Sequence, residues 1–286
     1  MGIIINPYIS FPSASFADDK ALYRTWATGA GNFAGVDDSN GMGIEWDEYD
    51  EFSISFWVKP GWSSSLNTNV HLFCMNDVGN TSSGGGLIRI YYHESNNRIY
   101  FDWRSNGSNR TSNFWLFHST SSQYLDAYNA AGLGSTYWSN TNRGNVGDDD
   151  YTMITVTKGS DDQAKNSNVS LYWNDASCGN GYYANGLNAG TPALNNNDRK
   201  VAFGSTSWNN YRAGNYSTTR YNDITFWDKR LTASEVSELY NNGTRMDATT
   251  HSAASDLKGY YTFETAAATI GEDTNLPNGG STIGNV

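Results

Sequence analysis

The feature that most constrains this chain is a series of short segments in which apolar and polar side chains alternate. In the clearest segment, FSISFWV at residues 52–58, every second residue is Phe, Ile or Val, and Pro60 ends the pattern. A repeat of two residues is that of a β-strand with one buried face. Further segments of this kind lie at residues 87–93, 98–104, 151–159, 168–176, 200–205 and 222–228. Because no helical pattern separates them, the sequence predicts an all-β protein in which antiparallel sheets pack as a sandwich.

One segment near the end of the chain, LTASEVSELYNNG, has a different pattern. Thr232 and Glu235 have the spacing of a helix N-cap and its capping box. Leu231 and Val236 have the spacing of a hydrophobic staple, and Gly243 is the type of residue that ends a helix. The sequence therefore predicts one short C-terminal helix, whose apolar side closes an edge or an end of the sandwich.

Composition and charge limit the functions that this chain can have. Its 286 residues can bury a large core, and its aromatic content of 14% is too high for a disordered chain. The formal net charge of −11 gives a surface that repels nucleic acids and anionic membranes. The opening MGIIINPYIS has no basic region, so it does not resemble a signal peptide, and no stretch reaches the length of a membrane span. We therefore expect neither nucleic-acid binding nor membrane insertion.

The two cysteines, Cys74 and Cys178, form no CxxC motif and have no metal-ligand spacing. Two buried thiols and a single disulfide between them are both compatible with the sequence. Neither arrangement makes this chain a disulfide-stabilised scaffold, because the chain is long enough to bury a core without one.

Several segments occur in the order typical of laminin-G-like jelly rolls, which belong to the concanavalin A-like lectin/glucanase superfamily. They are FAGVDDS, FSISFWVKP, YTMITVTK, VSLYWND, VAFGS and YNDITFWDKRLTASEVSELYNNG, within residues 33–243. The chain departs from the family pattern at Asp175, where Gly is usual, in a longer stretch at 105–147, and in a loop-rich stretch at 175–198. The resemblance implies a jelly-roll sandwich.

The segment after the predicted helix extends this resemblance. SDLKGYYTFE, at residues 255–264, is similar to a family strand that often comes first in the domain, but here it follows the helix. This order, together with the INPYISF start, resembles laminin-G-like proteins of tailed bacteriophages. The domain organisation that follows is an N-terminal arm at residues 1–30 and one sandwich at residues 31–286, which the strand at 255–264 completes.

This second resemblance implies a virion surface protein of a tailed phage, which would be a capsid decoration, a head-fibre or a tail-associated component. Such a protein would be located in the virion, with other virion proteins or further copies of itself, in a homo-oligomer, as partners. The alternative is a carbohydrate-binding lectin module that recognises host-surface glycans, with or without Ca²⁺.

The acidic segment EWDEYDE, at residues 45–51, is the strongest candidate for catalysis. Glycoside hydrolases of the superfamily carry alternating acids on one strand, which place a nucleophile and an acid/base beside one glycosidic bond. Here Glu45 and Asp47 would share a face, but the position of the third Glu holds Tyr49 or Asp50, depending on the spacing. We therefore interpret the segment as a solvated acidic turn and predict that the protein is not an enzyme.

Aspartates in predicted loops are the candidate metal ligands. These residues are Asp37, Asp38, Asp148, Asp149 and Asp150. Carboxylates are the hard oxygen ligands that Ca²⁺ prefers, and the family resemblance implies that one Ca²⁺ can lie at a loop rim. The alternative is that these aspartates form turns, because Asp is common at turn positions.

Aromatic residues in polar loops are the candidate ligand-binding residues. These are Trp138, Tyr182, Tyr183, Trp208 and Tyr211, in segments too rich in Gly and Asn to be central strands. Aromatic rings beside amides suit sugars, because C–H faces stack on the ring while hydroxyls bond to the amides. The alternative is that the rings fix loops to the sandwich or line a subunit interface.

Overall fold

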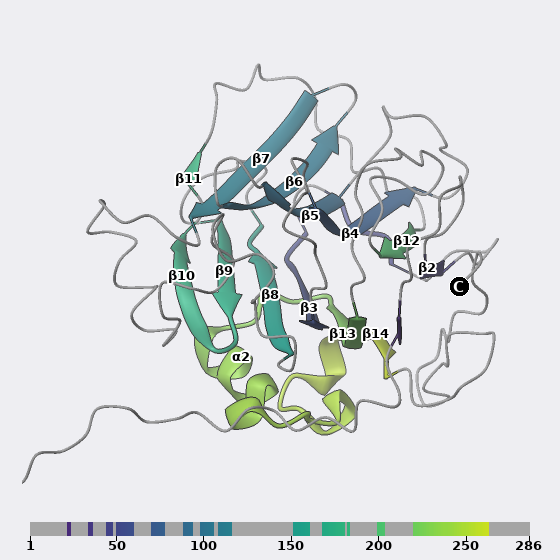
Figure 1. Ribbon diagram of the computed structural model, residues 1–286, viewed down its shortest axis with the longest axis vertical. Helices are drawn as coiled ribbons and strands as arrows, with labels where there is room; N and C mark the ends of the chain where they lie inside the picture. The colour runs from purple at the N-terminus through teal and green to yellow at the C-terminus, as the bar shows by residue number, and fades with distance from the viewer. Residues whose placement is uncertain are drawn as a thin grey trace, which may run out of the picture.

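The fold is a sandwich of two antiparallel β-sheets (Figure 1). The structure is a computed structural model that describes residues 22–23, 34–36, 44–47, 50–59, 70–77, 88–93, 98–105, 108–115, 151–160, 168–180, 182–183, 199–203 and 220–262. Within these residues, each sheet contains seven strands. The predicted fold class, an all-β antiparallel sandwich of the jelly-roll type with one short C-terminal helix, is confirmed.

Sheet A contains the strand with the clearest alternation, β3, near its middle. Its spatial order is β1 (Leu22–Tyr23), β13 (Arg220–Trp227), β3 (Phe52–Lys59), β8 (Thr152–Lys158), β9 (Val169–Trp173) and β10 (Ala176–Asn180). The late strand β14 (Leu257–Tyr261) also pairs with β13. β1, which lies within the predicted N-terminal arm, pairs with β13 as well.

Sheet B contains the predicted hairpin around the ESNN segment, formed by β5 and β6. Its spatial order is β11 (Tyr182–Tyr183), β7 (Ser108–Trp115), β6 (Arg98–Ser105), β5 (Ile88–His93), β4 (Val70–Asp77), β12 (Arg199–Phe203) and β2 (Ala34–Val36). β7, β10 and β11 lie in the two stretches that depart from the family pattern. These stretches therefore widen both sheets at one end.

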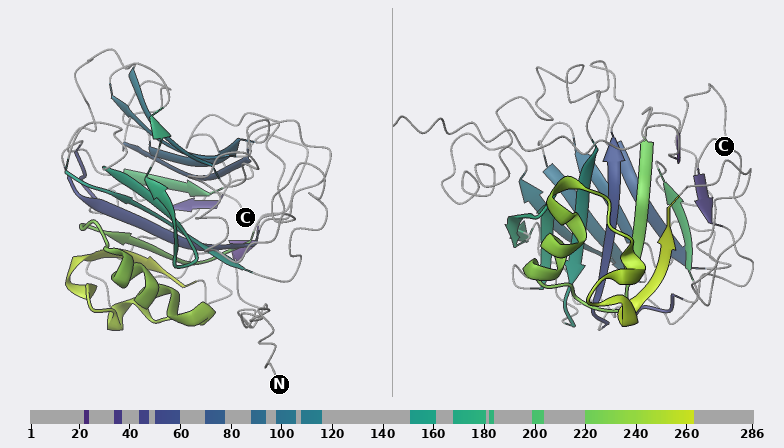
Figure 2. Two further views of the ribbon diagram at one scale, coloured as in Figure 1. Left: turned by 90° about the vertical axis from the view of Figure 1, so that its left-hand side faces the viewer. Right: turned by 90° about the horizontal axis from the view of Figure 1, so that it is seen from below.

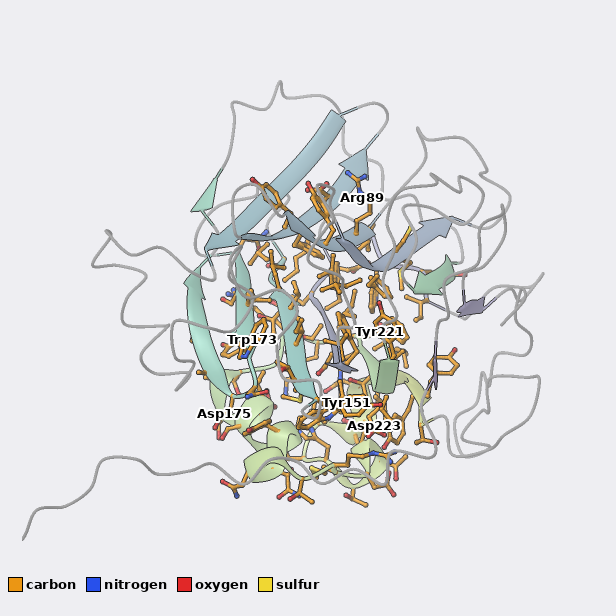
Figure 3. The ribbon with its side chains drawn as sticks, viewed as in Figure 1. Arg89, Tyr151, Trp173, Asp175, Tyr221 and Asp223 are labelled. Atoms are coloured by element: carbon orange, nitrogen blue, oxygen red, sulfur yellow. The ribbon has the colours of Figure 1, made fainter. Side chains whose placement is uncertain are left out.

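The main core lies between the two sheets and is rich in aromatic rings. The inward residues of β3 are fully buried, and they are Phe52, Ile54, Phe56 and Val58. Phe56 of sheet A contacts Phe73 of sheet B, with 6.4 Å between the ring centroids. Tyr221, labelled in Figure 3, donates a hydrogen bond from its hydroxyl to the carbonyl oxygen of Leu72 at 2.8 Å. The alternation predicted for β3 therefore faces the core as expected.

A second apolar cluster covers the outer face of sheet A. Its members come from the outward positions of the strands, from the helix α2 (Ala233–Tyr240) and from the turns after this helix. They are Trp57, Tyr151, Met153, Tyr172, Trp227, Leu231, Val236, Leu239, Ala248, Ala253, Leu257 and Tyr260. Figure 2 shows α2 and these turns lying across the strands of sheet A, on the side away from sheet B. The helix packs on this outer face because large apolar side chains project outward from alternate positions of the strands. We expected the helix at an edge or an end of the sandwich, but it lies on a face of sheet A.

The ends of α2 follow from local chemistry. Thr232 is the N-cap and accepts from the Glu235 amide, while the Glu235 side chain accepts from the Thr232 amide. Leu231 and Val236 are buried in the same cluster, so the predicted capping box and staple are both present. The first left-handed residue is Asn241, at φ 47°, so the helix ends before the predicted Gly243.

Three 3-10 turns follow α2. They are η2 (Asn241–Gly243), η3 (Ala248–Thr250) and η4 (Ala254–Asp256). In the part of the chain that the structure describes, no helix is long and apolar enough to cross a membrane.

Candidate functional site

The structure describes part of the predicted site. The predicted residues outside the described part are Asp37, Asp38, Trp138, Asp148, Asp149, Asp150, Trp208 and Tyr211. Tyr182 and Tyr183 form β11, an edge strand whose backbone pairs with β7. The predicted roles of all ten residues in binding a ligand or Ca²⁺ stay predictions.

A polar and aromatic cluster on the outer face of sheet B is the candidate site in the described residues. Ile88 and Ile90 of β5 point into the core, so the residues that alternate with them, Arg89 and Tyr91, project outward. Tyr100 and Asp102 of β6 project outward by the same argument, and the register places each opposite its β5 neighbour. We call these four residues the outer cluster. Figure 3 shows Arg89 on the side of sheet B that faces away from sheet A.

An ion pair joins the two strands within the outer cluster. Arg89 Nη2 donates to Asp102 Oδ2 at 2.5 Å, and the side chains are 16% and 2% exposed. Arg89 Nε and Asp102 Oδ1 are also buried, but neither makes a hydrogen bond within the described structure. Buried polar atoms in native proteins are usually bonded to protein, water or a ligand. The pair is therefore electrically balanced, and one donor and one acceptor of the pair are buried without a partner in the described residues.

A second ion pair, between Arg245 and Asp223 on sheet A, has a different hydrogen-bonding pattern from the Arg89–Asp102 pair. Asp223 accepts from Arg245 through both carboxylate oxygens, and its Oδ1 also accepts from the Tyr260 hydroxyl at 3.0 Å. Asp223 is labelled in Figure 3 close to the turns after α2. Because its oxygens have these partners, this pair holds the C-terminal turns on β13.

Two aromatic rings lie beside the Arg89–Asp102 pair, and of these Tyr91 is half-buried and Tyr100 is buried. The rings of Tyr91 and Tyr100 stack with centroids 5.1 Å apart and planes 10° apart. The guanidinium carbon of Arg89 lies 5.3 Å from the centroid of the Tyr91 ring, within the range of a cation–π contact. The cluster therefore combines stacked rings with a charged pair, and its partly exposed members are Arg89 and Tyr91.

The phenol of Tyr91 is held in its neutral form. Burial, followed by the nearby negative charge of Asp102, raises the pKa of Tyr91 well above its ordinary value of 10.0. Near neutral pH the hydroxyl therefore keeps its proton, and its hydrogen bond to the Asp102 side chain contributes to this shift.

The register extends the outer cluster towards β11. Tyr91 is opposite Tyr100, Tyr100 is opposite Asn113 of β7, and Asn113 is opposite Tyr182. Residues directly opposite one another in antiparallel strands belong to the same cross-strand row. The backbone position of Tyr182, one of the predicted ligand-binding residues, therefore lies in the same row as the two stacked tyrosines.

The acidic segment before β3 forms a turn. The Asp47 amide donates to Asp50 Oδ2 at 2.7 Å, and the Asp50 amide donates to Asp47 Oδ1 at 3.0 Å. Glu45 is exposed, whereas Trp46 is buried and stacks on Phe52 with 4.3 Å between ring centroids. The carboxylates of Asp47 and Asp50 therefore fix the turn, as the acidic-turn interpretation expects.

No set of three or more His, Cys, Asp or Glu side chains in the described part of the chain is arranged to hold a metal ion. The aspartates predicted to bind Ca²⁺ lie outside that part, so calcium binding stays a prediction.

Sequence reasoning missed the four residues of the outer cluster. A signal was present, because IRIYYH and RIYFDWR place an Arg and an Asp at alternate positions among apolar and aromatic residues. The predicted hairpin loop of four residues, ESNN, also fixes which residues face each other. Counting back from His93 and Arg98 pairs Arg89 with Asp102.

No protein-family model and no curated protein matches the sequence. Among solved structures, the botulinum neurotoxin serotype D binding domain has 15% identity and a TM-score of 0.46, over 78% of this chain and 42% of that chain. The serotype G binding domain has 16% identity and a TM-score of 0.39, over 68% and 36%. A heptameric SAP-like pentraxin from Limulus polyphemus has 10% identity and a TM-score of 0.36, over 80% and 79%. This chain spans about two fifths of the serotype D domain, and values this low carry no conclusion about its ligands.

Proposed function

We propose that this protein is a non-enzymatic carbohydrate-binding module of the lectin type, and that the outer cluster of sheet B belongs to its ligand surface. The observation that carries the proposal is the cation–π contact between Arg89 and Tyr91, two half-buried side chains on the outer face of sheet B. Sugars present apolar C–H faces and hydroxyl groups together, so one residue of a glycan can use both features.

The chemistry of the cluster favours binding over hydrolysis. Glycoside hydrolysis in most families needs two carboxyl groups on either side of the scissile bond. The outer cluster contains the single carboxylate of Asp102, and that carboxylate is already bonded to Arg89. In the acidic segment, Asp47 and Asp50 bond to each other's backbone amides, which supports a role in the turn.

A glycan array probed with the full chain tests the proposal. We expect binding to a defined group of glycans, and we expect a Tyr91→Ala change to weaken it by at least about tenfold, because the ring stack is lost. A matched control is Lys229→Ala, which removes the ion pair to Glu235 on α2, on the other side of the molecule. Absence of binding to any glycan, with both proteins folded, would refute the proposal.

A second candidate function is that of a virion surface component of a tailed phage, either a capsid decoration, a head-fibre or a tail-associated protein. The observation that favours it is the position of β14, which follows α2 in the chain and pairs with β13. This is the strand order on which the resemblance to phage proteins rests. The partners would be other virion proteins or copies of the chain itself, and glycan binding is compatible with such a location.

Mass spectrometry of purified particles tests the virion proposal. Particles from a culture that produces this chain should contain it in a fixed ratio to the major capsid protein. Antibodies against the chain should also label the particle surface in electron micrographs. Recovery of the chain solely in the particle-free fraction would contradict this location without affecting the glycan proposal.

A further inference from the structure

The ring of His251 lies between α2 and the outer face of sheet A, at the end of η3. Its side chain is 0% exposed, and its ring centroid lies 4.9 Å from that of Trp227 on β13. Nε2 lies 2.9 Å from the carbonyl oxygen of Glu235 on α2, and Nδ1 lies 3.0 Å from the amide nitrogen of Ala253. The ring therefore bonds α2 to residues 247–256, which we call the turn segment.

These two partners fix the protonation state of the ring. An amide nitrogen donates and a carbonyl oxygen accepts, so Nδ1 of His251 is an acceptor and Nε2 carries the single proton of a neutral ring. A second proton on Nδ1 would face the N–H of Ala253, and two buried donors would then lie together without an acceptor between them. The observed arrangement therefore requires the neutral ring.

The turn segment is held at both ends by bonds that do not involve His251. Before it, Arg245 pairs with Asp223 on β13, and at its end the Asp228 amide donates to the Asp256 carbonyl oxygen at 2.8 Å. Between these points, the segment contributes two small side chains to the apolar cluster, Ala248 and Ala253. Small side chains bury little apolar area, so the bonds of His251 are a large part of what holds the middle of the segment.

Glu238 of α2 faces the ring as a charged group. Its Oε2 lies 3.7 Å from Nε2, and its side chain is 37% exposed. This negative charge favours a proton on the ring, but a partly exposed ion pair contributes little, so it weakens a response to acid without removing it. The other charged side chains on the adjoining elements are Lys229 with Glu235, Lys258 with Asp228, Arg245 with Asp223, the η3 cap Asp247, and Asp256 of η4.

We propose that His251 is an acid-sensitive switch, in which protonation of the ring breaks its bond to the Ala253 amide and releases the turn segment from α2 and sheet A. An exposed histidine takes up a proton at about pH 6.5. Because the bonded ring has no free site for this proton, protonation favours the open state. By linkage, the closed state keeps its full stability above about pH 6.5 and loses stability as the pH falls below it. Opening uncovers the Trp227 ring, which is fully buried in the closed state.

Hydrogen exchange of the full chain at pH 7.5 and pH 5.5, followed by mass spectrometry and corrected for the intrinsic exchange rates, tests the switch. We expect the protection of residues 247–256 to fall about tenfold at pH 5.5, because one pH unit below 6.5 weakens the closed state by about that factor. Strand β3 lies in the main core and is the internal reference, so its protection should stay unchanged. Equal protection of the turn segment at the two pH values would overturn the inference.

The variant His251→Asn separates the proton from the hydrogen bond. An Asn side chain can accept from the amide two residues further on, so it can keep the bond to Ala253, but it does not titrate. Protection of the turn segment should therefore be the same at both pH values in this variant. The matched control is His93→Gln, which removes a histidine from β5 of sheet B and should keep the tenfold fall. A response to pH that persists in His251→Asn would refute the role of this residue.

A second variant, Glu238→Gln, tests the switch without altering the ring. Gln can still accept from the Ser252 amide, as Glu238 does at 2.8 Å, but it has no negative charge beside Nε2. The protonated ring loses a favourable neighbour, so protection of the turn segment at pH 5.5 should fall about twofold further than in the parent. A smaller fall than in the parent would contradict the inference, and this result decides the matter even if His251→Asn does not fold.

Discussion

At the scale of residues, two ion pairs in the described part of the chain each join an arginine to a buried aspartate, and they differ in their hydrogen bonding. Asp223 is 5% exposed, lies at φ 42°, and is bonded to Arg245 and Tyr260. Asp102 is equally buried but keeps one oxygen without a partner in the described residues. Removing one member of a buried pair leaves an uncompensated charge, which costs more than the pair contributes as a whole.

The variant Arg245→Leu should therefore be strongly destabilised. Asp223 would stay buried without its main partner, so we expect the free energy of unfolding to fall by about 3 kcal/mol, measured by urea denaturation. The control Lys229→Leu removes a partly exposed pair with Glu235 and should cost less than about 1 kcal/mol. Equal losses of unfolding free energy in the two variants would show that the Asp223–Arg245 pair contributes no more to stability than the exposed pair.

The residues of the outer cluster illustrate what a sequence can and cannot specify. Arg89 and Asp102 are thirteen positions apart, and their pairing depends on the register that the four-residue hairpin loop sets. Their burial and the two unbonded atoms depend on the packed structure, and no pattern in the sequence encodes them. The register places Tyr182, one of the predicted ligand-binding residues, in the same cross-strand row as Tyr91, and its role in binding stays a prediction.

At the scale of elements, α2 depends on its N-terminal cap. The N-cap Thr232 and Glu235 satisfy amides that have no partner within the helix. The variant Thr232→Ala should lower the free energy of unfolding by about 1 kcal/mol, as measured by urea denaturation. Ser234→Ala is a matched control, because Ser234 is exposed in the first turn and is not the cap. A larger loss in the control than in Thr232→Ala would contradict the assignment of the cap.

Prediction of the strands succeeded where the two-residue period is regular. β3 alternates without interruption, and its inward residues are all buried. β4 was not predicted, because a register shift between His71 and Phe73 interrupts its alternation. β7, SNRTSNFW, has apolar residues at its end alone, so its pairing with β6 is not visible in the hydrophobic pattern.

At the scale of the whole molecule, neutral tyrosines lie on the outer faces of both sheets. Burial raises the pKa of Tyr91 on sheet B and of Tyr172, Tyr240 and Tyr260 on the sheet A side above the ordinary value of 10.0. The folded state therefore holds these protons at a pH where the unfolded chain releases them. By linkage, this contribution is fully present below about pH 10 and decreases as the pH rises beyond it.

Stability should therefore fall as the pH rises above about 10, with a slope of up to about 1.4 kcal/mol per pH unit for each such tyrosine. Urea unfolding between pH 9 and pH 11, compared with phenolate absorbance, measures this decrease. The Tyr260→Phe variant should be less stable at neutral pH, because it loses the bond to Asp223, but its stability should fall less steeply above pH 10. A steeper fall in this variant would contradict the linkage.

The layered architecture was predictable from the sequence, but the second apolar cluster was not. Alternating strands without helices between them specify a sandwich, and the capping signals around Thr232 specify the helix. The face on which the helix packs depends on outward residues such as Trp57 and Trp227, which become neighbours through strand pairing. From the sequence alone, these residues are expected on the solvent-exposed face of each strand.

The apolar cover on sheet A gives the sandwich two unlike sides. One side is sealed by α2 and its turns, and the other carries the charged pair and the stacked rings. Copies anchored to a common support through the sealed side would hold their charged pairs in parallel. Individually weak contacts would then add through avidity. A dense array of copies would therefore bind a repetitive polymer more tightly than a single copy does.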